Sequence, residues 1–216
     1  MIDASKARGK YHGCVMRSLS AHRWLATLFV LALYAMAAPG HAEVTTVNGA
    51  TWITGEITPR DLQALRDRKQ PGLVVHLHSG GGMVTSAIAI GRLLREVKGV
   101  ARVEAGSSCL SACVFVLAGA PYRVVQTGAV IGIHRPYDPN DLPTASDQQK
   151  LKHATLDAYV RAYLKQMNVP LSLYDAMLKA PEVRHLPPPE LGWYGLNATD
   201  RKQEADDAES GRQRTP

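Results

Sequence analysis

The chain has 216 residues, a length that suits one domain with short appendages, and a formal net charge of +6. Residues 1–42 contain five basic residues and one acidic residue, which leaves only +2 for the rest of the chain. The sequence shows no basic stripe interleaved with aromatic residues, so nothing in its composition supports binding to nucleic acid.

Residues 1–42 have the pattern of a secretory signal peptide. Basic residues precede the apolar run 24–38, and Pro39-Gly40-His41-Ala42 supplies small residues for cleavage before Glu43. The apolar run is shorter than the roughly 20 residues that a membrane-spanning helix needs. We therefore expect a periplasmic or secreted protein, with an uncleaved anchor in the inner membrane as the alternative.

Residues 43–198 alternate between short apolar segments and segments with apolar residues at helical spacing. The predicted strands are 53–57, 73–78, 100–104, 123–125 and 129–133, and the predicted helices are 60–69, 84–98, 112–118, 147–167 and 172–178. This order predicts an α/β domain with a mostly parallel sheet flanked by helices. The tail 199–216 mixes basic and acidic residues without an apolar cluster, and we expect it to be disordered.

Three segments place reactive or flexible groups at the ends of predicted strands. The turn Ser79-Gly80-Gly81-Gly82 gives a backbone whose amides can approach a ligand oxygen. Ser111 lies where a small-residue turn gives way to an apolar helix, which suits a nucleophile with the Ala112 amide as an oxyanion donor, or a plain helix cap. His134 follows the strand 129–133, at the sheet edge where α/β proteins bind ligands.

Nucleotide and metal sites are not indicated by the remaining motifs. The glycine turn continues as Met83-Val84-Thr85. This segment lacks the Gly-Lys-Ser/Thr ending of a phosphate loop, and it lacks the third glycine of a dinucleotide site. His76 and His78 alternate on one strand without a third ligand nearby, so we interpret them as packing or turn residues. The sequence predicts neither a cofactor nor a metal.

Cys109 and Cys113 are four positions apart, which places them on one face of a helix. Export would bring them into a compartment that permits disulfides, and their expected Cα separation of about 6 Å is compatible with one. A regular helix aims the two sulfurs poorly at each other. Two small buried apolar residues are therefore the favoured interpretation, with a disulfide as the alternative.

Four segments form a recognisable combination between about Thr51 and Leu196. They are Thr54-Gly55-Glu56-Ile57, Ser79-Gly80-Gly81-Gly82-Met83-Val84, Ser111-Ala112 and Gly132-Ile133-His134-Arg135-Pro136. In order and spacing they resemble the proteolytic subunit of Clp protease, a member of the crotonase-like superfamily. The resemblance implies repeated β-β-α units, Ser111 as nucleophile and His134 as its base. It also implies oxyanion donors at Gly81, at Gly82 and on Ala112.

The third catalytic residue of that family does not align plainly. The family has an aspartate before an acidic-x-x-x-Tyr-Gly-Leu segment, which is similar to Glu190–Leu196 here, and this alignment selects Val183. Glu182 is adjacent and is the residue that we assign to orient His134, with Asp175 as a poorer candidate. Loss of the acid from a comparable triad lowers the rate by orders of magnitude.

The sequence thus predicts an exported serine hydrolase, a peptidase that cleaves peptides or unfolded segments by acyl transfer through Ser111. One alternative is a binding or scaffold protein that has lost efficient catalysis. Another is a crotonase-like enzyme that acts on an acyl thioester through two backbone amides. The resemblance implies a homo-oligomer, and the Cys-x-Ser-x-Cys sequence at 109–113 is similar to that of an exported subgroup. No ATP-driven unfoldase is expected as a partner, because such machines work in the cytosol.

Overall fold

The computed structural model describes residues 43–136 and 146–197, so the predicted signal peptide and the predicted tail lie outside the described residues. The strands are β1 (Glu43–Val47), β2 (Ala50–Ile57), β3 (Val74–Gly82), β4 (Val100–Val103), β5 (Ser108–Leu110), β6 (Tyr122–Val125), β7 (Val130–Ile133) and β8 (Arg184–His185). The helices are α2 (Pro59–Asp67), α3 (Val84–Glu96), α4 (Cys113–Gly119), α5 (Asp147–Gln166), α6 (Ser172–Leu178) and α7 (Pro188–Trp193). Among these helices, none has both the length and the apolar character needed to cross a membrane.

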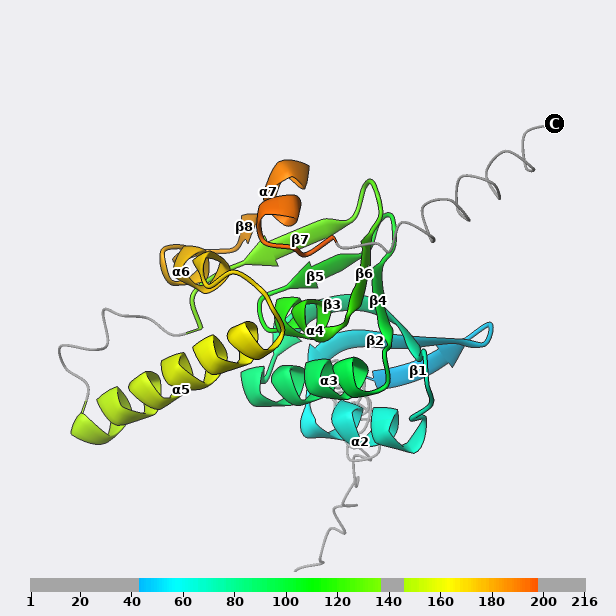
Figure 1. Cartoon of the computed structure of the whole chain (residues 1–216), viewed down its shortest axis with the longest axis horizontal. Coiled ribbons are helices and arrows are strands. Elements are labelled where there is room, and N and C mark those ends of the chain that lie inside the picture. Colours follow the sequence, from blue (N-terminus) through cyan, green and yellow to red (C-terminus); the bar gives the residue numbers. More distant parts are fainter. Residues whose placement is uncertain (1–42, 137–145, 198–216) are drawn as a thin grey trace, which may run out of the picture. The chain divides into compact units, whose positions relative to one another are not determined.

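Strand β3 organises the sheet because it pairs with different strands along its length (Figure 1). Its first residues pair in parallel with β4, and its later part pairs in parallel with β5 through Ser79 and Cys109. β6 extends the branch of β4, and β7 extends the branch of β5, again in parallel. Antiparallel pairs join β1 to β2 and β8 to β7.

The element order contains repeated units of two strands and a helix. β1, β2 and α2 form one such unit, β4, β5 and α4 a second, and β6, β7 and α5 a third. With most strand pairs parallel and helices packed on the sheet, the predicted α/β class with a mostly parallel sheet flanked by helices is confirmed.

The structure corrects the predicted conformation of the segment from Val74 to Gly82. The strand β3 continues through Gly82, so the four residues predicted as a turn belong to the strand. Gly81 and Gly82 pair with β2, and Ser79 pairs with Cys109 of β5. Only one face of this strand is buried: Val75 and Leu77 are inaccessible, whereas Val74 is 38% exposed. The apolar run therefore reflects strand propensity as well as burial.

Helices α3 and α4 pack side by side over the sheet at two glycines (Figure 1). A Cβ atom on Gly91 would collide with the Tyr163 hydroxyl and lie 2.9 Å from the Phe115 carbonyl oxygen, and a Cβ on Gly119 would collide with the same hydroxyl. Tyr163 is fully buried and donates a hydrogen bond of 2.6 Å to that carbonyl. Burial raises the pKa of Tyr163, which keeps the hydroxyl protonated as a donor. This contact fixes the second half of α5 to the core.

Candidate active site

Ser111 lies in a strained elbow between β5 and α4. Its φ of 54° falls in the left-handed region, which disfavours residues other than glycine. The Ser111 amide donates to the Gly132 carbonyl at 2.9 Å, and the Ser111 carbonyl accepts from the Val114 amide at 3.1 Å. The N-cap residue of α4 is Ala112, without a side-chain cap. The strain at Ser111 is therefore not explained by helix capping, and it resembles that of nucleophiles at strand-to-helix turns.

A disulfide between Cys109 and Cys113 spans the elbow. Their Cα atoms are 5.3 Å apart, and both residues are inaccessible to solvent. Cys109 belongs to β5 and Cys113 begins α4, so the two cysteines do not share one helix. The poor sulfur alignment of a regular helix consequently does not apply, and the bridge ties together the two elements that flank Ser111.

Gly81 faces Ser111 from β3. A Cβ atom on Gly81 would lie 2.7 Å from Ser111 Cβ and 3.1 Å from Ser111 Oγ. The missing side chain is thus what allows the β3 backbone to approach the serine hydroxyl. At Gly82 the missing side chain allows β3 to approach β2 instead, because a Cβ there would lie 2.5 Å from the Ile57 amide nitrogen on β2.

The two predicted oxyanion donors differ in their hydrogen bonding. The Gly81 amide donates to Ser79 Oγ at 3.1 Å, and this buried hydroxyl donates in turn to the Gly55 carbonyl at 2.5 Å. The Ala112 amide comes just before the first turn of α4, where backbone N–H groups have no intrahelical acceptor. In this structure Ala112 is therefore the more available donor.

His134 leaves the sheet beside Ser111. β5 and β7 are parallel with Leu110 opposite Gly132, so Ser111 and His134 both emerge at the carboxyl ends of adjacent strands. His134 Nδ1 is 2.7 Å from the Arg135 carbonyl oxygen. Among the described residues, no hydrogen bond joins His134 to Ser111 Oγ.

Val183 lies just before β8 and contacts β7. Gly132 pairs with His185 and Ile133 with Arg184, and beyond this ladder the Arg135 amide donates to the Ala180 carbonyl at 2.8 Å. Val183 Cγ1 would be 2.9 Å from a Cβ atom on Gly132, which confirms that this side chain reaches β7. Val183 carries no hydrogen-bond acceptor on its side chain.

Neither of the two acidic residues predicted to orient His134 is hydrogen-bonded to it in the described part of the chain. Glu182 is exposed, and within the described part of the chain it makes neither a hydrogen bond nor an ion pair. Asp175 lies 2.8 Å from Arg161 Nη2 in an ion pair. The structure therefore brings no carboxylate to His134 from either predicted position. The sequence carries no signal for the carbonyl contact that occurs instead, because every residue has a carbonyl.

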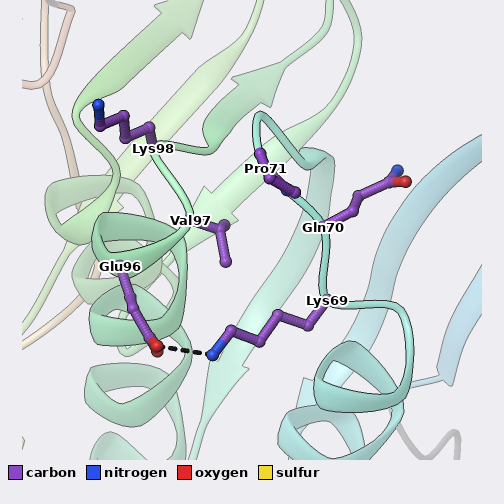
Figure 2. Close-up of a pocket in the computed structure, with 6 residues that line it drawn as sticks. All are labelled: Lys69, Gln70, Pro71, Glu96, Val97 and Lys98. Carbon is purple, nitrogen blue, oxygen red and sulfur yellow. Dashed lines mark hydrogen bonds and ion pairs between the residues drawn. The ribbon is translucent and has the colours of Figure 1, made fainter.

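Cavities occur at both ends of the sheet. One of about 520 Å³ lies where β3 begins and α3 ends, and Figure 2 shows the residues that line it: Lys69, Gln70, Pro71, Glu96, Val97 and Lys98. It contains an ion pair of 2.6 Å between Lys69 and Glu96 but brings together no hydroxyl, thiol or imidazole. Another, of about 390 Å³, is lined by Ala176 and residues 179–184, where the chain enters β8. Neither Ser111 nor His134 lines either of these two cavities.

His76 and His78 have packing partners on the sheet. The His76 ring stacks on Trp52 with centroids 4.6 Å apart, and its Nδ1 lies 2.9 Å from Glu104 Oε1. His78 Nδ1 accepts a hydrogen bond of 3.2 Å from the Ser108 amide. Within residues 43–136 and 146–197, no three histidine, cysteine or acidic side chains are grouped to hold a metal ion.

Comparisons with known proteins assign no family to the chain. No family model matches the sequence, and no curated protein matches it either. Among similar solved structures is a mutant of the 1510-N membrane-bound stomatin-specific protease, with a TM-score of 0.49 and 19% identity over 70% of this chain and 79% of that chain. A likeness at this level does not identify an activity.

Proposed function

We propose that this chain is a serine hydrolase in which Ser111 is the nucleophile. The observation that carries the proposal is the left-handed Ser111 at the β5–α4 elbow, with Gly81 directly against its hydroxyl. Such an elbow exposes the hydroxyl and directs the following amide, on Ala112, toward the carbonyl under attack. A serine with a purely structural role has no need of this strain.

The proposed reaction is acyl transfer through a covalent intermediate. Ser111 Oγ attacks the substrate carbonyl carbon while His134 accepts the hydroxyl proton, and the Ala112 amide binds the resulting oxyanion. The tetrahedral intermediate then loses its amine or alcohol, which takes the proton from His134. Water repeats the sequence on the acyl group and regenerates Ser111. The Gly81 amide becomes a second donor once it releases Ser79 Oγ.

The proposed substrates are peptides or unfolded segments in the periplasm or outside the cell. The signal-like pattern of residues 1–42 supports export, and so does the disulfide, because such bonds persist mainly in oxidising compartments. A homo-oligomer belongs to the same proposal. It is supported by the exposed first half of α5, where Leu151 is 67% accessible.

A second candidate function is a catalytically weak binding or scaffold protein. Two observations favour it: His134 has no carboxylate partner among the described residues, and the Gly81 amide is already engaged by Ser79. Both features would slow acyl transfer. Neither removes the nucleophile or the base.

Labelling with a fluorophosphonate probe separates the two candidates. The chain from residue 43 onward is expected to react covalently, whereas Ser111→Ala is expected not to react. Ser108→Ala is the matched control, because Ser108 lies on β5, the strand that leads to Ser111, and its backbone pairing with Val130 survives the change. Absence of labelling in the unmodified chain, or equal labelling of Ser111→Ala, would contradict the hydrolase proposal. Hydrolysis of an acyl thioester that survives Ser111→Ala would instead favour the thioester enzyme.

A further inference from the structure

We infer that Glu56 selects substrates with a lysine or an arginine on the acyl side of the bond that is cleaved. The inference rests on the proposed function, because it names a substrate class for the same site. It is carried by the position of Glu56 at the end of β2, the strand that follows β3 when one moves away from β5 and Ser111 in the sheet.

Glu56 lies next to the part of β3 that faces Ser111. In the parallel ladder between β2 and β3 it pairs with Gly81, the glycine directly against Ser111. A Cβ atom on Gly82 would lie 3.0 Å from Glu56 Cγ, so the Glu56 side chain runs along this exposed glycine, and its carboxyl group is one bond further. Because β2, β3 and β5 are parallel, their carboxyl ends place Glu56 and Ser111 at the same edge of the sheet.

The charge of Glu56 has no partner within the described part of the chain. The side chain is exposed and makes neither a hydrogen bond nor an ion pair there. The next carboxylate along the sequence, Asp61, is buried and accepts hydrogen bonds from the Thr58 amide and hydroxyl. Glu56 is therefore the carboxylate of this segment that a ligand can reach.

Met83 places an apolar side chain beside this carboxylate. Its amide donates to the Ile57 carbonyl at 2.9 Å, which holds Met83 against the end of β2, and its side chain is 48% exposed. Lysine and arginine combine an apolar stem with a cationic head. An exposed thioether next to the exposed Glu56 fits both parts of such a side chain.

The strand order determines which part of a substrate meets Glu56. The sheet runs β2, β3, β5, β7, so Gly81 lies on one side of Ser111 and His134 follows the strand on the other side. In the proposed reaction the leaving amine takes its proton from His134 and so lies toward β7. The acyl part then extends across β3 toward β2. Since strands are about 4.8 Å apart and an extended chain advances about 3.3 Å per residue, this span corresponds to about three residues.

Binding of short peptides to the Ser111→Ala chain tests the preference without requiring hydrolysis. The probes are alanine tetrapeptides with a neutral fluorophore at the amino end and one lysine or one glutamate at each position in turn. They end at the residue that would form the acyl group, so they represent the acyl side alone. By fluorescence anisotropy, the best lysine peptide should bind about fivefold more tightly than its glutamate counterpart at low salt. This ratio should approach one at high salt, because salt screens exposed charges.

Charge variants of the same Ser111→Ala chain assign the preference to one residue. Glu56→Gln should bring the ratio below about twofold, and Glu56→Lys should favour the glutamate peptide. Glu96→Gln is the matched control, because it removes the same charge at the opposite end of the sheet, from the ion pair with Lys69 that Figure 2 shows, and it should keep the preference. A preference that is absent, that survives Glu56→Gln, or that is lost equally in Glu96→Gln would overturn the inference.

Peptide binding and probe labelling can fail independently. A lysine preference that depends on Glu56, in a protein whose Ser111 does not react with the fluorophosphonate, would support the cationic site and contradict the hydrolase proposal. Labelling of Ser111 together with a peptide preference that is unchanged in Glu56→Gln would support the hydrolase and overturn the role of Glu56.

Discussion

Reduction of the Cys109–Cys113 disulfide is expected to lower the free energy of unfolding by about 2 kcal/mol. The bridge spans a sequence separation of 4, and closing so short a loop removes on the order of 7 cal/mol/K from the unfolded chain. At 25 °C this entropy corresponds to about 2 kcal/mol, or a fall of roughly 4–8 °C in Tm for a domain of this size. The measurement is thermal unfolding followed by circular dichroism, with and without reductant.

The matched control for this experiment is the double variant Cys109→Ala/Cys113→Ala. It has no bridge, so its Tm should not respond to reductant. A reduced wild-type chain whose thiols titrate as free but whose Tm is unchanged would refute the entropy reasoning. An equal response of the double variant would show that the reductant acts elsewhere.

The same reduction should slow the reaction of Ser111 with the fluorophosphonate probe. A left-handed conformation costs a residue with a side chain roughly 1–2 kcal/mol, and the bridge holds both flanks of the elbow in place. We expect a several-fold lower rate after reduction. Equal rates would mean that the pairing of the Ser111 amide with Gly132 is sufficient to hold the conformation.

Three further predictions concern single side chains. Gly81→Ala should lower probe labelling at least a hundredfold, because its Cβ would lie 2.7 Å from Ser111 Cβ, and a normal rate would remove Gly81 from the site. Tyr163→Phe should cost about 1–2 kcal/mol at pH 7 by leaving the Phe115 carbonyl without its donor. Burial raises the Tyr163 pKa above its ordinary 10.0, so the wild type should lose stability relative to this variant as the pH rises past 10, measured by urea unfolding at each pH. Thr58→Ala should cost about 1 kcal/mol, since it removes the capping box of α2, and an unchanged urea midpoint would contradict this.

The long elements could be predicted from the sequence because each has one consistently apolar face. In α3 the buried residues recur at helical spacing, and Thr58-Pro59 marks the start of α2 by well-known capping chemistry. The location of Ser111 and His134 at one edge of the sheet followed from the same reasoning, since parallel strands end on the same side.

The shorter features of the site could not be predicted in this way. β5 and β8 are too short to show any periodicity, yet β5 provides one flank of the elbow and β8 sets the position of Val183. The four-residue spacing predicted one helical face for Cys109 and Cys113, because the short strand that contains Cys109 was not visible in the pattern. The hydrogen bond from the Gly81 amide to Ser79 Oγ joins residues only two positions apart, and it too could not be predicted from a periodic pattern.

The Tyr163 hydroxyl links parts of the chain that come together at different times during folding. Its acceptor, Phe115, is 48 residues away in sequence, whereas strands β3 to β7 and the helices among them form contacts over shorter intervals. Contacts that close long loops tend to form late, because their entropy cost must be met first. Docking of α5 should therefore follow the assembly of the sheet. Tyr163→Phe would then accelerate unfolding while leaving the refolding rate almost unchanged.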